Sequence, residues 1–149
     1  MAYKKNKALK YKGRTYRSKF EVSIAKELYA LGIKFKYEHK SFSYLDPVPR
    51  AECSDCNSKD VFVRRSYTPD FFLENGIIIE AKGKLDFAAR KKLKAIKGSN
   101  PDLDLKILFM RDQKISKGST TLYSEWAYQH GFDYQVTNVP KRWTTNGKD

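Results

Sequence analysis

The sequence contains no apolar run of about 18 residues, the length that a membrane-spanning helix needs. No hydrophobic segment follows the basic N-terminus, so a secretory signal is not expected either. Cysteine is scarce: Cys53 and Cys56 form a single C-x-x-C, which excludes the disulfide framework of a small secreted domain. We therefore expect a cytoplasmic protein with no membrane partner.

Acidic residues are also in deficit. Seventeen Asp and Glu stand against thirty Lys and Arg, which gives a net charge of +13 and favours a polyanionic partner such as nucleic acid. The 149 residues are nevertheless 40% hydrophobic and 14% aromatic, enough for one core. This composition excludes a disordered basic tail as the whole protein.

The chain divides into three parts. Residues 1–17 carry seven Lys and Arg and no acid, so we expect a flexible basic arm, for which simple solubility is the alternative reading. Residues 18–143 form the expected domain, and residues 144–149 a tail. Within the domain, spacing predicts helices over 18–32, 86–98 and 119–131, and strands over 33–39, 40–49, 61–73, 76–82, 103–110 and 132–136. This order predicts an α/β fold, a mixed β-sheet flanked by helices.

Charged residues occur on two runs that otherwise read as buried strands, "VFVRRSYTPDFFL" and "GIIIEAK". If the loop between the runs were residues 75–76 alone, Asp70 and Glu80 would point to opposite faces of the sheet. A three-residue loop over 74–76, with its glycine in the left-handed conformation, places Asp70 opposite Glu80. A bulge near Pro69 would give the same result.

Directly opposed carboxylates repel each other, and a divalent cation reverses this effect. Mg²⁺ takes oxygen ligands and keeps water in its shell, so Asp70 and Glu80 form a usable partial site. Lys82, two residues beyond Glu80, lies on the same face and can polarise the attacking water or stabilise charge in the transition state. This pattern favours phosphodiester hydrolysis. The alternative is that Glu80 and Lys82 mark a strand that runs out into solvent.

A third carboxylate, Glu21, lies one turn into the first predicted helix. Glu21 could serve the active site, or it could have the purely structural role of a capping box, in which it bonds the backbone of Ser18. The residues alone leave both roles open.

The stretches "YRSKFEVSIAKELYALGIKFKYE", "YTPDFFLENGIIIEAKG", "NPDLDLKILF", "KGSTTLYSEWAYQHGF" and "VPKRW" occur in this order. In this the chain resembles the phage endonuclease I family of Holliday-junction-resolving enzymes, within the PD-(D/E)xK nuclease superfamily. The resemblance implies a restriction-endonuclease-like fold. It also implies an intertwined, domain-swapped homodimer, in which each active site draws elements from both chains and the pair nicks branched DNA.

Carried over by position, the resemblance makes Glu21, Asp70 and Glu80 metal-binding carboxylates, with the Ala81 carbonyl as a further ligand and Lys82 as the catalytic lysine. It implies two Mg²⁺ ions per active site, with Mn²⁺ able to substitute. Basic residues are expected to contact DNA phosphates without reading sequence. These candidates are Arg14, Arg17, Lys19, Lys84, Arg90, Lys91 and Lys94.

Residues 48–65 depart from the family pattern and are expected to be an inserted loop or knuckle. The C-x-x-C of Cys53 and Cys56 is half of a structural zinc site, and completing it requires His39, an acid or a partner chain. Reduced thiols are the default expectation, with structural Zn²⁺ as the alternative.

The leading hypothesis is therefore a Mg²⁺-dependent endonuclease that selects four-way junctions and other branched DNA. A homing, nicking or transposase-type nuclease acting on duplex DNA is the alternative within the same superfamily. A non-catalytic protein that binds branched DNA is the alternative of a different class.

Overall fold

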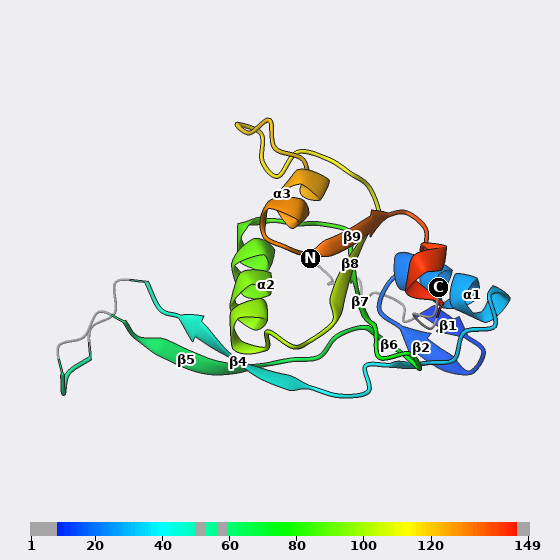
Figure 1. The fold of residues 1–149 in the computed structure, drawn as a ribbon, viewed down its shortest axis with the longest axis horizontal. Coiled ribbons are helices and arrows are strands. Elements are labelled where there is room, and N and C mark those ends of the chain that lie inside the picture. Colours follow the sequence, from blue (N-terminus) through cyan, green and yellow to red (C-terminus); the bar gives the residue numbers. More distant parts are fainter. Residues whose placement is uncertain (1–8, 50–52, 57–59, 146–149) are drawn as a thin grey trace, which may run out of the picture.

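A computed structural model describes residues 9–49, 53–56 and 60–145 of the chain. Its centre is a five-stranded mixed sheet in the order β3-β6-β7-β8-β9 (Figure 1). β3, β6 and β7 are antiparallel neighbours, whereas β7, β8 and β9 run parallel. The five strands are β3 (Phe35–Tyr37), β6 (Phe71–Leu73), β7 (Ile78–Lys82), β8 (Leu105–Phe109) and β9 (Asp133–Val136). The predicted α/β class with a mixed sheet and flanking helices is confirmed.

Helices cover both faces of this sheet. α1 (Lys19–Ala30) lies on one side, and α2 (Phe87–Ser99) and α3 (Tyr123–Gln129) lie on the other (Figure 1). Successive strand residues point to opposite faces, so Ile79 joins the core under α1 while Ile78 joins the core under α2 and α3. None of the described helices is long and apolar enough to cross a membrane.

The turn between β6 and β7 is the predicted three-residue loop. The N–H of Leu73 donates to the carbonyl of Ile77 over 2.9 Å, and Gly76 has a φ of +90°. The ladder pairs Phe71 with Ile79. One step further along the same register, Asp70 stands opposite Glu80, as predicted.

The predicted flexible arm is wrong for residues 9–16. β1 (Leu9–Tyr11) and β2 (Arg14–Tyr16) form a tight antiparallel hairpin that packs against α1. Tyr16 is buried in the core under α1, where its ring stacks near Phe71 with 6.3 Å between the ring centroids. The hydrophobic contact that orders this segment comes from distant strands, so charge alone gave no sign of it. Residues 1–8 lie outside the described part of the chain.

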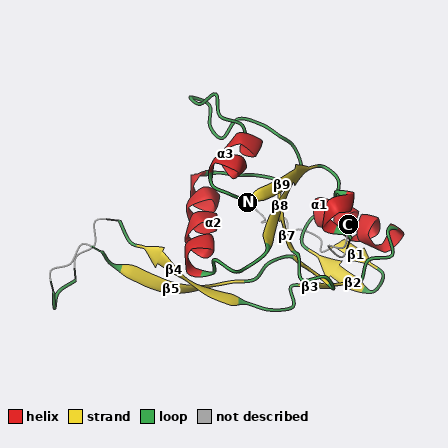
Figure 2. Ribbon diagram, viewed as in Figure 1, coloured by secondary structure: helices red, strands yellow, loops and turns green. Residues whose placement is uncertain are grey.

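The predicted strand over 61–73 is two strands in different sheets. β5 (Phe62–Tyr67) pairs with β4 (Phe42–Pro47) over six residues, and the chain then turns at residues 68–70 before entering β6. The β4–β5 ribbon projects from the body of the molecule at the lower left of Figure 2. Residues 62–65, expected to belong to an inserted loop, are therefore strand.

α2 holds the ribbon in place at its base. Asp86, the first residue of the predicted helix over 86–98, caps the start of α2 by accepting from the N–H of Ala89. At the other end of the helix, Ser99 Oγ accepts from the N–H of Leu45, and Asn100 donates to the carbonyl of Ser43. These bonds satisfy the outer edge of β4, an edge that would otherwise be open for pairing.

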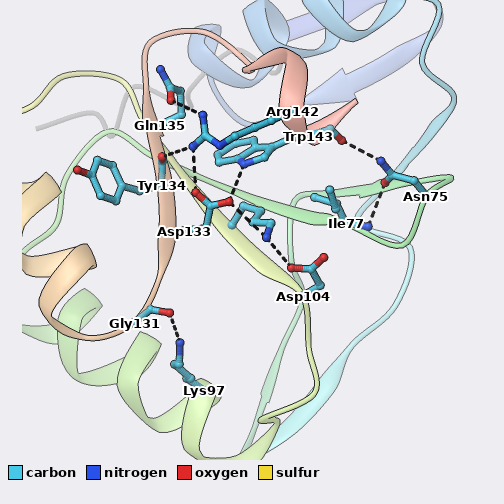
Figure 3. Close-up of polar contacts among 11 residues, drawn as sticks. Asn75, Ile77, Lys97, Asp104, Gly131, Asp133, Tyr134, Gln135, Arg142 and Trp143 are labelled. Carbon is cyan, nitrogen blue, oxygen red and sulfur yellow. Dashed lines mark hydrogen bonds and ion pairs between the residues drawn. The ribbon is translucent and has the colours of Figure 1, made fainter. Parts of the chain in front are cut away.

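The C-terminal segment is fastened to the sheet by a polar network (Figure 3). Asp133 accepts from the indole N–H of Trp143 and from the guanidinium of Arg142, each over 2.9 Å. Asn75, in the β6–β7 turn, donates to the carbonyl of Trp143 over 2.8 Å. Trp143, at the end of the short helix η1 (Lys141–Trp143), is fully buried. The last helical turn of the chain thus supports the hairpin that carries Asp70 and Glu80.

Candidate active site

Glu80 is held by two side chains, one on each carboxylate oxygen. Lys82 Nζ lies 2.9 Å from Oε1, and the Tyr67 hydroxyl donates to Oε2 over 2.5 Å. Glu80 is 6% exposed, so this charge is almost wholly removed from water. A buried carboxylate with two charge-assisted partners is orientationally fixed, because rotating it would break both contacts.

Asp70 lies beside Glu80 at the start of β6. Its Oδ2 accepts from the backbone N–H of Ala81 over 2.8 Å. Asp70 is 7% exposed, so the carboxyl is nearly as buried as that of Glu80. Burial, followed by the charge of Glu80, raises the pKa of Asp70 to about 9. Asp70 is therefore protonated at neutral pH in the metal-free protein, because burial and the neighbouring Glu80 disfavour its charged form.

Glu21 reaches the same region from α1. Its charge contributes to the raised pKa of Asp70, and its side chain is buried. Ser18 caps the helix as predicted, since its Oγ accepts from the N–H of Glu21. The second half of the predicted capping box is wrong: the Glu21 carboxylate accepts from the Ser18 hydroxyl over 3.1 Å rather than from its backbone.

Lys82 ends β7 with its side chain one-fifth exposed. Burial lowers its pKa, but the charges of Glu80 and Asp70 outweigh burial and raise the pKa above the ordinary lysine value. Lys82 is accordingly an ammonium group at neutral pH, poised between buried acids and solvent.

The donor set suits a hard divalent cation. Within residues 9–49, 53–56 and 60–145, no three Asp, Glu, His or Cys side chains lie close enough together to form a ready-made metal site. Carboxylate oxygens are the ligands that Mg²⁺ prefers, so these acids would suit such an ion beside their protein partners. The N–H and C=O of a strand residue point to the same neighbour, so the Ala81 carbonyl faces the Asp70 side.

A buried hydroxyl beside the acids supports this fit. Tyr37 Oη has no hydrogen-bond partner in the described part of the chain. Burial, together with the charges of Glu21 and Glu38, raises the pKa of Tyr37. A buried hydroxyl without a partner is costly, and a hydrated cation among these acids would supply one.

The predicted DNA-contacting residues differ in their exposure and in their partners. Lys19, Lys84 and Lys94 are exposed, Arg17 pairs with Glu38 over 2.7 Å, and Lys91 lies 3.9 Å from Asp46. Arg14 is half-buried with its guanidinium over the ring of Phe35. Arg90 differs from the other candidates, because its guanidinium donates to the backbone carbonyls of Leu85 and Ile115. These bonds occupy a group that was expected to contact DNA.

The two cysteines lie far from the cluster, beyond the end of β4 in the projecting ribbon. Both are free thiols. His39 precedes β4, so six strand residues, about 20 Å, separate it from the cysteine end of the ribbon. His39 of the same chain therefore cannot complete a zinc site there, and the zinc hypothesis stays a prediction because residues 50–52 and 57–59 lie outside the described part.

Sequence reasoning missed Tyr67. The tyrosine belongs to β5, which pairs with β4 and not with the strand of Glu80. Its contact with Glu80 arises where β5 ends, just before the chain turns at residues 68–70 into β6. The only local signal is an aromatic residue three positions before Asp70, and nothing in that spacing identifies its partner.

Comparison with known proteins places the chain in one family. The family described as "Phage endonuclease I" matches residues 1–149. The chain is 37% identical over 129 residues to "Endodeoxyribonuclease 1" of Enterobacteria phage T3, covering 86% of this chain and 76% of that protein. It is 34% identical over 134 residues to "Endonuclease I" of Escherichia phage T7, covering 89% of this chain and 80% of that protein. The chain thus belongs to the phage endonuclease I family.

Proposed function

We propose that this protein is a metal-dependent endodeoxyribonuclease that cuts four-way junctions and other branched DNA. The observation that carries the proposal is that Glu21, Asp70 and Glu80 are all buried acids, with Lys82 paired to Glu80. A protein that only binds DNA gains nothing from buried acids that face a phosphate backbone. The names of the phage T3 and T7 relatives support DNA as the substrate.

In the proposed mechanism, Asp70, Glu80 and Glu21 would hold Mg²⁺ together with the Ala81 carbonyl. Bound there, Mg²⁺ ions supply a Lewis acid for the phosphate and an activated water. Asp70, whose pKa is about 9 without metal, would have to lose its proton to serve as a ligand. Lys82 is already an ammonium and stabilises the charge that develops on the phosphate oxygens.

We further propose a restriction-endonuclease-like core and a homodimer, because paired nicks across a junction need two active sites. Within one chain, the charges of Glu80, Glu21 and Lys82 all act on Asp70, which supports a shared site. Exchange of α1 between two chains would build the same site from both copies. The net charge of +13 supports phosphate contacts by Arg17, Lys19, Lys84 and Lys94.

Cleavage of a labelled four-way junction beside a linear duplex of equal length tests the proposal. We expect paired cuts at the junction in Mg²⁺, none in EDTA, and none by Glu80→Ala. Glu74→Ala is the matched control, since Glu74 is an exposed acid in the turn of the same hairpin and should cut normally. Junction binding without cuts would overturn the enzymatic proposal, and preferential cutting of the linear duplex would support a homing or transposition nuclease instead.

A further inference from the structure

Tyr67 makes an unusual contact for a residue of the projecting ribbon. It ends β5, faces Phe42 across the β4–β5 pair and is 3% exposed. Its hydroxyl donates to Glu80 Oε2 over 2.5 Å, in the interior of the molecule. The ribbon thus reaches the carboxylate cluster through a single hydroxyl group.

Packing alone does not account for that hydroxyl. The ring lies in the core under α2, and Lys92 Nζ lies 5.4 Å from its centroid. A phenylalanine would fill the same space without bringing a second polar group beside a buried charge. What the hydroxyl adds is a short, directional bond to Glu80.

Two anchors determine how Glu80 presents its oxygens. Lys82 lies on Oε1 and Tyr67 on Oε2, so the plane of the carboxylate is fixed at both ends. Each carboxylate oxygen has two lone pairs, and one hydrogen bond on each leaves capacity for a cation. Groups that bond metal ligands from outside typically change metal affinity 10–100-fold when they are removed.

We propose that Tyr67 is a positioning residue, whose hydroxyl holds the Glu80 carboxylate in the orientation that binds a divalent cation. The inference rests on the proposed metal-dependent cleavage. It joins the β4–β5 ribbon to the active site as part of the scaffold that organises the metal ligands.

The test compares Tyr67→Phe with Tyr44→Phe. Both changes remove one hydroxyl from a buried tyrosine, and Tyr44 lies on the same face of the ribbon without a bond to a cluster acid in the described structure. Mn²⁺ binding, measured from the electron paramagnetic resonance signal of the free ion, reports on the site without any turnover. Cleavage rates against Mg²⁺ concentration, junction binding in EDTA and melting temperatures complete the set.

We expect Tyr67→Phe to raise the Mn²⁺ dissociation constant and the Mg²⁺ concentration for half-maximal cleavage by about 10–100-fold. Saturating Mg²⁺ should restore most of the rate, and junction binding in EDTA should be unchanged. Tyr44→Phe should behave like the wild type in all of these measurements.

Two results would overturn the inference while leaving the proposed function intact. One is a Tyr67→Phe protein whose Mn²⁺ affinity stays within twofold of the wild type. The other is an equal loss in Tyr44→Phe, which would trace the effect to general loosening of the ribbon. A wild-type protein that neither binds Mn²⁺ nor cleaves in Mg²⁺ would instead overturn the proposed function, and the inference with it.

Discussion

The carboxylate of Asp70 accepts a hydrogen bond from the backbone N–H of Ala81, on the strand that faces it. The last backbone pair of the β6–β7 ladder on this side is Phe71 with Ile79, so the ladder does not reach Ala81. A side chain therefore satisfies the backbone group that the ladder leaves open. This bond joins the start of one strand to the end of the other and holds two acids side by side.

Replacing Asp70 with asparagine should separate stability from activity. Asparagine keeps an oxygen that can accept from Ala81 but removes an acid that burial holds protonated up to about pH 9. Without metal at pH 8, we expect Asp70→Asn to be more stable than the wild type. Its unfolding free energy should be higher by at least about 1.4 kcal/mol, the equivalent of one pKa unit. Cleavage should fall at least about 100-fold. Urea unfolding and junction cleavage measure the two effects, and a less stable variant would contradict the reading of Asp70 as a strained acid.

The metal-free protein should lose stability as the pH rises. The pKa of Asp70 is about 9 in the folded chain against 3.8 for an ordinary aspartate, so the folded state binds the additional proton between these values. Its contribution is fully present below about pH 4 and is lost progressively toward pH 9. Melting curves from pH 5 to 9 in EDTA should show this slope, and the slope should flatten in Asp70→Asn. An unchanged slope in that variant would assign the pH dependence to other groups.

The two glycines Gly76 and Gly98 should respond oppositely to alanine. Gly76 has a φ of +90°, where an L-residue is strained although the surrounding space is open. We expect Gly76→Ala to lower the unfolding free energy by about 1–2 kcal/mol. Gly98 lies in the last turn of α2, with no atom within 4 Å of an added Cβ. We expect Gly98→Ala to raise the unfolding free energy by about 0.4–1 kcal/mol. Urea unfolding of both variants checks the pair, and equal effects would contradict the turn geometry.

The side chain of Asp133 should stabilise the packing of the C-terminal segment against the sheet. It pairs with Lys106 over 3.3 Å and accepts from Arg142 and Trp143, and these bonds lower its pKa although burial opposes them. Asp133→Ala should cost about 1–3 kcal/mol, because the indole N–H of buried Trp143 loses its acceptor. Asp102→Ala, at an exposed acid, is the control and should change stability by less than about 0.5 kcal/mol. Equal losses of unfolding free energy in the two variants would show that the bonds of Asp133 do not stabilise the packing of η1.

The sequence by itself determined the features that depend on neighbouring residues. The three-residue turn at 74–76 set the register that opposes Asp70 and Glu80, and Ser18 and Asp86 marked the starts of their helices. Turn geometry and helix caps are written in a few adjacent residues, because the backbone conformation of each is local.

Only the tertiary structure decided which distant groups surround those acids. The bond from Tyr67 to Glu80 and the packing of Tyr16 against Phe71 both join elements whose local sequence gives no sign of the partner. The break between β5 and β6, which the sequence reads as one strand, sends β5 into a separate ribbon. Such contacts depend on how whole elements pack, and burial rewards them only after the chain has closed around the sheet.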